Sequence, residues 1–144
     1  DPWTPRDLPF PDINTLTREA ARQAYEQAGL GPKDLDLVEL HDCFATAELL
    51  HYENLGLCGE GEAGRMIDEK QTYLGGEIPV NVSGGSLGCG HLLEASGLAR
   101  VLEVVLQLRG EAGPRQLKDV RTGLAFAWRG LPTSSGAAII LSGE

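Results

Sequence analysis

The chain has 144 residues, of which 42% are hydrophobic, and a formal net charge of −9. This length fits one domain with a substantial core. The acidic balance and the lack of any Lys/Arg cluster exclude a nucleic-acid-binding protein, because phosphate contacts need a basic patch. No apolar run reaches the ~20 residues of a membrane span, so we expect none.

Three cysteines occur at wide spacing: Cys43, Cys58 and Cys89. An odd, widely spaced set does not make a disulfide framework. Reduced thiols are typical of the cytosol, so we expect a cytoplasmic protein.

The first 14 residues contain four prolines and no apolar periodicity. This predicts an extended Pro-rich arm over 1–14, ahead of a domain over 15–144. A helix is predicted from Thr15 to Ala28, where small apolar residues recur every four positions. Gly29 and the following Gly-Pro pair end that helix.

Helices and strands then alternate, which is typical of an α/β fold built in layers. The apolar run 35–40 predicts a short buried strand. The last two predicted strands adjoin and form a hairpin. Further helices are predicted over 45–55, 62–69 and 93–109, and further strands over 79–82, 122–128 and 137–141.

The first candidate site follows the strand 35–40. His41 and Cys43 are two residues apart, so their side chains point the same way in an extended backbone. The carboxyl edge of a sheet is where α/β proteins bind ligands, and a tuned cysteine can transfer protons. Alternatively, Cys43 is a small buried hydrophobe and His41 a satisfied polar residue. The spacing leaves both interpretations open.

The second candidate is the glycine-rich segment before the helix 93–109. Four glycines in residues 84–90 precede His91. Such backbone can cradle a phosphate or an oxyanion, and a histidine there can polarise a carbonyl. The alternative is a structural turn with a capping histidine.

Two other kinds of site are disfavoured by spacing. The histidines and cysteines show no CxxC or HExxH pattern, so we expect no metal site. The serine-hydrolase pattern Gly-x-Ser-x-Gly is also absent.

The two motifs together resemble thiolases, in particular the sterol-carrier-protein type, from Thr15 to the end of the chain. Residues 41–44 are similar to that subgroup's His-Asp-Cys-Phe motif, and residues 81–97 are similar to its Asn-x-Ser-Gly-Gly and Gly-His-Pro block. The resemblance implies the C-terminal half of a thiolase, with a mixed five-stranded sheet covered by helices. It implies an acyl-CoA acyltransferase of lipid metabolism, acting on 3-ketoacyl-CoA or sterol and lipid CoA thioesters.

The resemblance also implies roles for individual residues. His91 would activate the nucleophilic cysteine and help bind the thioester oxygen. His41 would contribute to an oxyanion hole, and Cys43 would be the acid/base. No resident cofactor is implied, since the CoA thioester is the substrate. Substrate and CoA binding would fall to Asn81, Ser83, Gly84, Gly85 and Gly90.

The chain departs from the family pattern in two positions and lacks one component. Leu92 replaces the proline of Gly-His-Pro, and Glu94 replaces a glycine. The nucleophilic cysteine belongs to an N-terminal half that this sequence does not contain. We therefore keep two alternatives: a retro-aldol lyase on β-hydroxyacyl-CoA with an OB-fold partner, and a non-catalytic binding or assembly subunit. The resemblance also implies a homodimer, and the glycines of residues 56–76 suggest a mobile lid.

Overall fold

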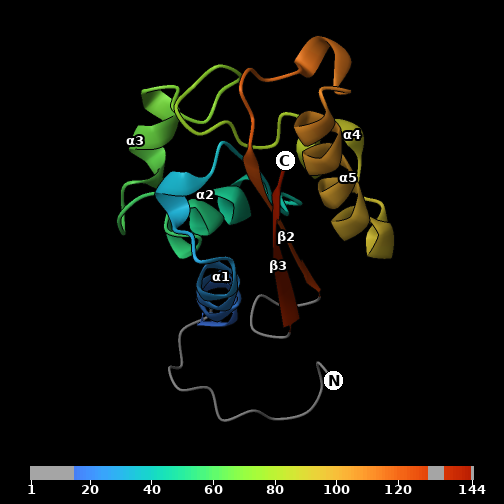
Figure 1. Cartoon of the computed structure of the whole chain (residues 1–144). Helices are drawn as coiled ribbons and strands as arrows, with labels where there is room; N and C mark the ends of the chain where they lie inside the picture. Colours follow the sequence, from blue (N-terminus) through green and yellow to red (C-terminus); the bar gives the residue numbers. More distant parts are fainter. Residues whose placement is uncertain (1–14, 130–134, 144) are drawn as a thin grey trace.

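The computed structural model describes residues 15–129 and 135–143, so the predicted Pro-rich arm lies outside the described residues. A small sheet separates two groups of helices, with α1, α2 and α3 on one side and α4 and α5 on the other (Figure 1). The helices are α1 (Thr15–Ala28), α2 (Ala45–Asn54), α3 (Ala63–Asp68), α4 (Gly85–Cys89) and α5 (Ser96–Arg109), and the strands are β1 (Leu37–Glu39), β2 (Thr122–Arg129) and β3 (Ser135–Ser142).

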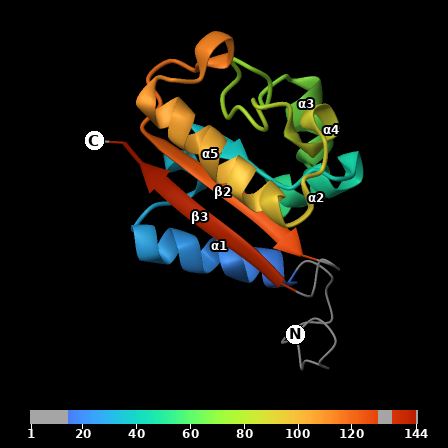
Figure 2. The ribbon, with the colours of Figure 1, turned by 90° about the vertical axis from the view of Figure 1, so that its right-hand side faces the viewer.

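The sheet has the order β1-β2-β3. β1 runs parallel to β2 with Val38 opposite Leu124. β2 and β3 form an antiparallel pair, and α5 lies along one face of that pair with α1 along the other (Figure 2). The predicted hairpin at the end of the chain is thus confirmed.

β1 and the middle of β2 are buried on both faces. Successive residues of a strand point to opposite sides, and helices cover both sides of these strands. Leu37 and Ala125 pack with Val104 of α5. The intervening residues face the other helices and form the larger core cluster, which includes Val38, Leu124, Phe126, Ala21, Tyr52 and Met66. The continuous apolar run around β1 follows from this double burial.

The sheet is smaller than the five strands that the resemblance implied. The described residues hold three strands, and Val80 adds only a single parallel bridge to Val38. Pro79 has no N–H for a ladder, and Asn81 has a φ of 50°, outside the β region. These two neighbours limit the predicted strand 79–82 to one bridge, and the fifth strand has no counterpart among the described residues.

The predicted helices are confirmed with small shifts of their ends. α1 has the predicted bounds, and Gly29 follows it with a φ of 66°. The helix predicted from residue 93 begins as a 3₁₀ turn (Leu93–Ala95) and becomes α-helical at Ser96. The short helix α4 was not predicted, because its glycines indicated only a turn. No helix among the described residues is long and apolar enough to cross a membrane.

Gly97 brings the first turn of α5 close to β2. A Cβ on Gly97 would lie 3.2 Å from the Cβ of Ala127. This approach places the loop before α5, with His91, over the end of the sheet.

Candidate functional site

A cavity of about 540 Å³ lies at the carboxyl end of β1 and between β2 and the start of α5. We call it the His41 cavity. His41 and Cys43 reach it from the residues after β1, and His91 from the loop between α4 and α5. Trp128 of β2 and Glu94 also line this cavity. The three catalytic residues predicted from the sequence therefore share one cavity.

The two cavity histidines are in direct contact. Their ring centroids are 5.1 Å apart and their planes nearly perpendicular. His41 is buried, and burial, followed by repulsion from His91, lowers the pKa of His41 below its usual value. His41 is therefore held neutral, as a group that donates a hydrogen bond rather than as a cation.

His91 is exposed, and its backbone surroundings fix its ring. The Leu93 N–H donates to Nδ1 of His91 at 3.1 Å. An accepting Nδ1 leaves the proton of the neutral ring on Nε2. Nε2 is thus the atom through which His91 can donate to a substrate oxygen.

Cys43 is partly buried beside these histidines. Burial raises the pKa of the Cys43 thiol, and a hydrogen bond from the Trp128 side chain lowers it in part. The net direction is upward, so Cys43 carries its proton at neutral pH. In this state it can give a proton to a carbanion before it takes one back.

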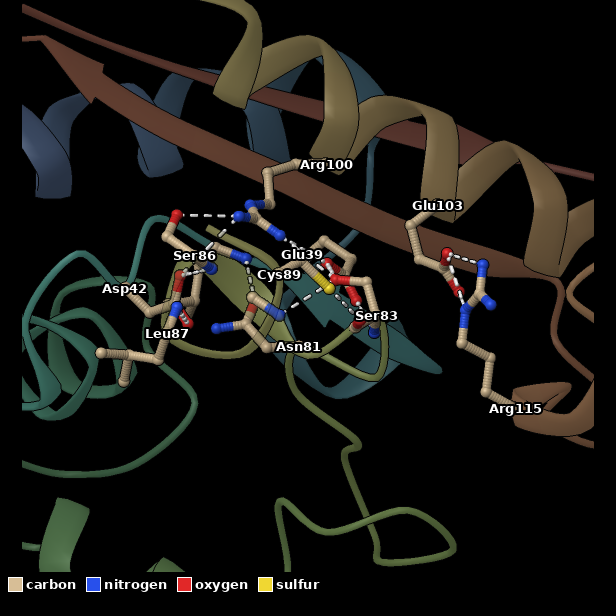
Figure 3. A network of polar contacts seen from close by, with 12 residues as sticks. Glu39, Asp42, Asn81, Ser83, Ser86, Leu87, Cys89, Arg100, Glu103 and Arg115 are labelled. Carbon is tan, nitrogen blue, oxygen red and sulfur yellow. Dashed lines mark hydrogen bonds and ion pairs between the residues drawn. The ribbon is translucent and has the colours of Figure 1, made fainter. Parts of the chain in front are cut away.

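A buried ionic cluster lies next to the His41 cavity and joins β1, the glycine-rich segment and α5 (Figure 3). We call it the Arg100 network, which consists of Glu39, Asp42, Ser83, Ser86 and Arg100. Arg100 is 4% exposed and Glu39 is fully buried. Buried charges are stable only when paired and hydrogen-bonded, so this cluster must keep its geometry.

The Glu39 carboxylate binds the glycine-rich segment through Ser83. It accepts the Ser83 N–H at 3.0 Å and the Ser83 hydroxyl at 2.6 Å. Arg100 lies 3.4 Å from the same carboxylate. Burial raises the pKa of Glu39, while the Ser83 hydrogen bonds and the charge of Arg100 oppose that rise.

The Asp42 carboxylate caps α4. It accepts the backbone N–H of Ser86 at 2.6 Å and that of Leu87 at 3.3 Å. Arg100 adds a hydrogen bond to the Ser86 hydroxyl at 2.8 Å and lies 3.8 Å from Asp42. Gly85 is required here, because a Cβ at this residue would overlap the Asp42 carboxylate. Asp42 thus ties the end of β1, between His41 and Cys43, to the segment that leads to His91.

The glycine-rich segment lies beside the His41 cavity and not in its wall. Ser83 and Gly85 belong to the surroundings of the Arg100 network, and Gly90 is exposed at the end of α4. Asn81 and Gly84 line a second cavity of about 380 Å³. We call this the Asn81 cavity. The structure therefore does not gather the predicted CoA-binding residues around His41, and their role in binding stays a prediction.

The segment 56–76 lies at the Asn81 cavity, to which it contributes Ile67, Thr72, Tyr73 and Leu74. None of its residues lines the His41 cavity. The expected lid is thus wrong for the His41 cavity, because α3 packs this segment against α2.

Sequence reasoning missed Trp128, His51 and the Arg100 network. Arg100 lies 61 positions from Glu39, and no local pattern links the two. Trp128 and His51 looked like ordinary core residues. One sequence clue was available: an arginine on the apolar face of a predicted helix needs a buried acidic partner. No three His, Cys, Asp or Glu side chains converge as metal ligands in the described part of the chain.

Comparisons with known proteins connect this geometry to a family. The family model for the thiolase C-terminal domain-like family matches residues 11–142. Sterol carrier protein 2 of Rattus norvegicus is 51% identical over 109 residues, which cover 76% of this chain and 20% of the rat protein. An acetyl-CoA acetyltransferase of Methanothermobacter thermautotrophicus is 49% identical over 108 residues, or 75% of this chain and 28% of that enzyme.

The solved structure of an "Ltp2-ChsH2(DUF35) aldolase" matches with a TM-score of 0.79 and 31% identity, over 88% of this chain and 31% of that one. The chain thus spans between a fifth and a third of the length of these relatives. The family model covers nearly the whole chain, and the α/β fold agrees with it. The chain belongs to the thiolase C-terminal domain-like family.

Proposed function

We propose that this chain is the C-terminal part of a thiolase-like acyl-CoA acyltransferase that forms or cleaves a C–C bond in 3-ketoacyl-CoA or in sterol and lipid CoA thioesters. The observation that carries the proposal is the meeting of His41, Cys43 and His91 in one cavity. The chain supplies the acid/base and the oxyanion donors. The nucleophilic cysteine comes from an N-terminal half.

In the direction of cleavage, the nucleophile attacks the keto carbon and the bond to the α-carbon breaks. The electron pair of that bond becomes an enolate on the departing acetyl thioester. His41 and His91 donate hydrogen bonds to the enolate oxygen. Cys43 gives its proton to the α-carbon. The resulting thiolate then takes the proton of the incoming CoA thiol, whose sulfur attacks the acyl-enzyme.

The protonation states of the cavity support these roles. A thiol with a raised pKa is protonated when the carbanion forms. His41, whose pKa is lowered, is too weak a base to compete well for that proton, and in its neutral form it donates a hydrogen bond without adding a positive charge. Both states follow from burial, so water must be kept out of the cavity during the reaction.

An exposed apolar surface supports a large packing partner. Leu98 and Leu102 on α5 are 72% and 58% exposed, and Leu93 in the turn before α5 is 72% exposed. Large contiguous apolar surfaces mark interaction sites. We propose that the N-terminal half packs here and brings its cysteine to the His41 cavity, and that the complete enzyme is a homodimer.

The test uses the complete protein, with Cys43→Ala and His91→Ala as variants. Turnover of a 3-ketoacyl-CoA with CoA should fall by roughly 10²–10⁴-fold in each. Cys58→Ala is the matched control, because Cys58 is also partly buried but lies outside the His41 cavity. Unchanged turnover in the Cys43 and His91 variants would sink the proposal. Tight binding of a partner without turnover by any form would instead support a non-catalytic subunit.

A second candidate is a retro-aldol lyase on β-hydroxyacyl-CoA, acting with an OB-fold partner. It is supported by the name of the solved relative, which is that of an aldolase, and by Glu94 in the wall of the His41 cavity. Product analysis separates the two reactions. A lyase releases an aldehyde or ketone from a β-hydroxyacyl-CoA without consuming CoA, whereas a thiolase consumes CoA and a β-ketoacyl-CoA.

A further inference from the structure

Asp42 lies between His41 and Cys43 in the chain, but its side chain points away from their cavity. His41 and Cys43 line the His41 cavity, whereas Asp42 does not. Neighbouring side chains of an extended segment point to opposite sides. The Asp42 carboxylate reaches α4 instead, where it accepts the backbone N–H groups of Ser86 and Leu87 at 2.6 and 3.3 Å. The segment thus presents two side chains to the cavity and one to the glycine-rich segment behind it.

The loop that carries His91 is held at both of its ends. On one side it follows α4 directly, since α4 ends two residues before His91. On the other side, Ser96 of α5 accepts the Leu92 N–H at 2.9 Å. The bond from the Leu93 N–H fixes the His91 ring within its own loop. The two bonds to Asp42 therefore join the α4 end of this loop to the end of β1.

His41 has firmer support than His91. The ring centroid of Trp128 lies 6.0 Å from that of His41, and the ring of His51 packs 4.3 Å behind the indole. His51 is fully buried, and burial, followed by repulsion from His41, lowers the pKa of His51 to about 4, so it is a neutral ring at pH 7. His91 is exposed and touches His41 with a centroid separation of 5.1 Å. A movement of α4 would thus displace His91 and leave His41 in place.

We propose that Asp42 is a positioning residue whose carboxylate sets the distance between His41 and His91 by holding α4 against the end of β1. The inference rests on the proposed function for the role of the two histidines at one enolate oxygen. Two donors reach the same atom only at one spacing, and a shift of roughly 1 Å can cost on the order of 10²-fold in rate. The carboxylate itself is fixed by Arg100 at 3.8 Å and by its tight fit against Gly85.

A double-mutant cycle in the complete protein tests this role, with Asp42→Asn and His91→Ala as the two changes. Asn keeps the size of Asp but turns an NH₂ group toward a backbone N–H. The kcat should fall by roughly 10–100-fold, and the KM should stay within about twofold because Asp42 does not touch the cavity. In the His91→Ala background, the same change should lower kcat by less than about threefold. An equal fall in both backgrounds would overturn the proposal, since a general loss of structure does not depend on His91.

Asp36→Asn is the matched control. The Asp36 carboxylate also joins distant segments, because it accepts the backbone N–H groups of Arg121 and Thr122 at 2.8 and 2.9 Å. It lies before the amino end of β1, whereas the His41 cavity lies at the carboxyl end. Its loss should change kcat by less than about twofold. Urea unfolding of each variant at the assay temperature confirms that the rates belong to folded protein.

A second variant and a structure keep the test decisive. Should Asp42→Asn not fold, Gly85→Ala displaces the carboxylate without removing its charge, and its effect on kcat should likewise vanish in the His91→Ala background. If His91→Ala alone left turnover unchanged, the proposed function would fail, and a crystal structure of the complete Asp42→Asn protein would decide the positioning role. A His41–His91 ring separation above 5.1 Å would support that role, and an unchanged separation would overturn it.

Discussion

The Arg100 network and the His41 cavity share the end of β1 but differ in how their polar atoms are satisfied. In the network, all four carboxylate oxygens of Glu39 and Asp42 accept hydrogen bonds, and of the network's side-chain atoms only Nε of Arg100 has no partner among the described residues. Beside the cavity, Nδ1 of His41 and both ring nitrogens of His51 have no partner among the described residues. The difference indicates that the network holds the shape, whereas His41 and His51 keep buried ring nitrogens without a partner in the described part of the chain.

The largest effect is expected when the network loses its cation. Arg100→Met leaves Glu39 and Asp42 buried without a compensating charge, which costs about 3–5 kcal/mol of unfolding free energy. Urea denaturation should show this loss. Arg22→Met is the matched control, because Arg22 pairs with Glu19 and Glu26 on the exposed face of α1. If both variants lost the same amount of unfolding free energy, burial would not explain the contribution of Arg100 to stability.

The cavity side should respond to acid through His51. The pKa of His51 is about 4 in the folded protein and about 6.5 in an unfolded chain. Between these values the unfolded chain binds a proton that the folded chain excludes. The stability that depends on a neutral His51 is therefore fully present above pH 6.5, and the unfolding free energy falls by about 3 kcal/mol as the pH is lowered to 4.

His51→Phe should remove this part of the pH dependence while it keeps a ring against Trp128. Urea unfolding of both proteins at pH 7 and pH 4.5 measures the difference. His41 adds a slope of the same sign in both proteins, since its pKa is also lowered. If the variant loses as much stability in acid as the parent, His51 is not the group responsible.

A smaller effect tests the fit between Asp42 and the glycine-rich segment. Gly85→Ala would force a methyl group into the Asp42 carboxylate at a φ of 62°. Gly61→Ala is the control, because Gly61 has a φ of 80° and nothing within 4 Å of the added methyl group. Gly85→Ala should therefore be less stable than Gly61→Ala by about 1–3 kcal/mol. If the two variants were equally stable, the contact between residue 85 and the Asp42 carboxylate would not be tight.

The smallest expected effect concerns charge at the cavity. Glu94 is exposed and lines the His41 cavity. Glu94→Gln should lower the KM for an anionic CoA thioester by roughly twofold to fivefold, since exposed charges contribute less than about 1 kcal/mol. Glu111→Gln is the control beyond the opposite end of α5. The gain should shrink at high salt, and its persistence there would point to shape rather than charge.

Local patterns predicted most of the fold. The repeat of small residues and Gly29 gave the bounds of α1, and the apolar strands gave the closing hairpin. The joint position of His41, Cys43 and His91 followed only from a family resemblance. The interval between Cys43 and His91 contains three helices, and no periodicity specifies how such an interval folds back.

The remaining features depend on partners far apart in the chain. Arg100, Glu39 and Asp42 form one cluster only because α5 crosses the end of β1. The predicted strand around Val80 pairs through a single bridge. The side chain of Asn81, rather than its backbone, accepts the Leu40 N–H at 2.8 Å. The hydrophobic pattern of the sequence does not predict that a side chain will take the place of a backbone partner in the sheet.

The hydrogen bond from the Leu93 N–H to His91 has a consequence for how this loop can evolve. The ring is oriented by the main chain, and Leu93, which donates the bond, has a φ of 52°. Neighbouring side chains can change without altering the tautomer. The replacements Leu92 and Glu94 are therefore compatible with this orientation of the His91 ring. Among natural substitutions at position 93, proline alone would delete the donor.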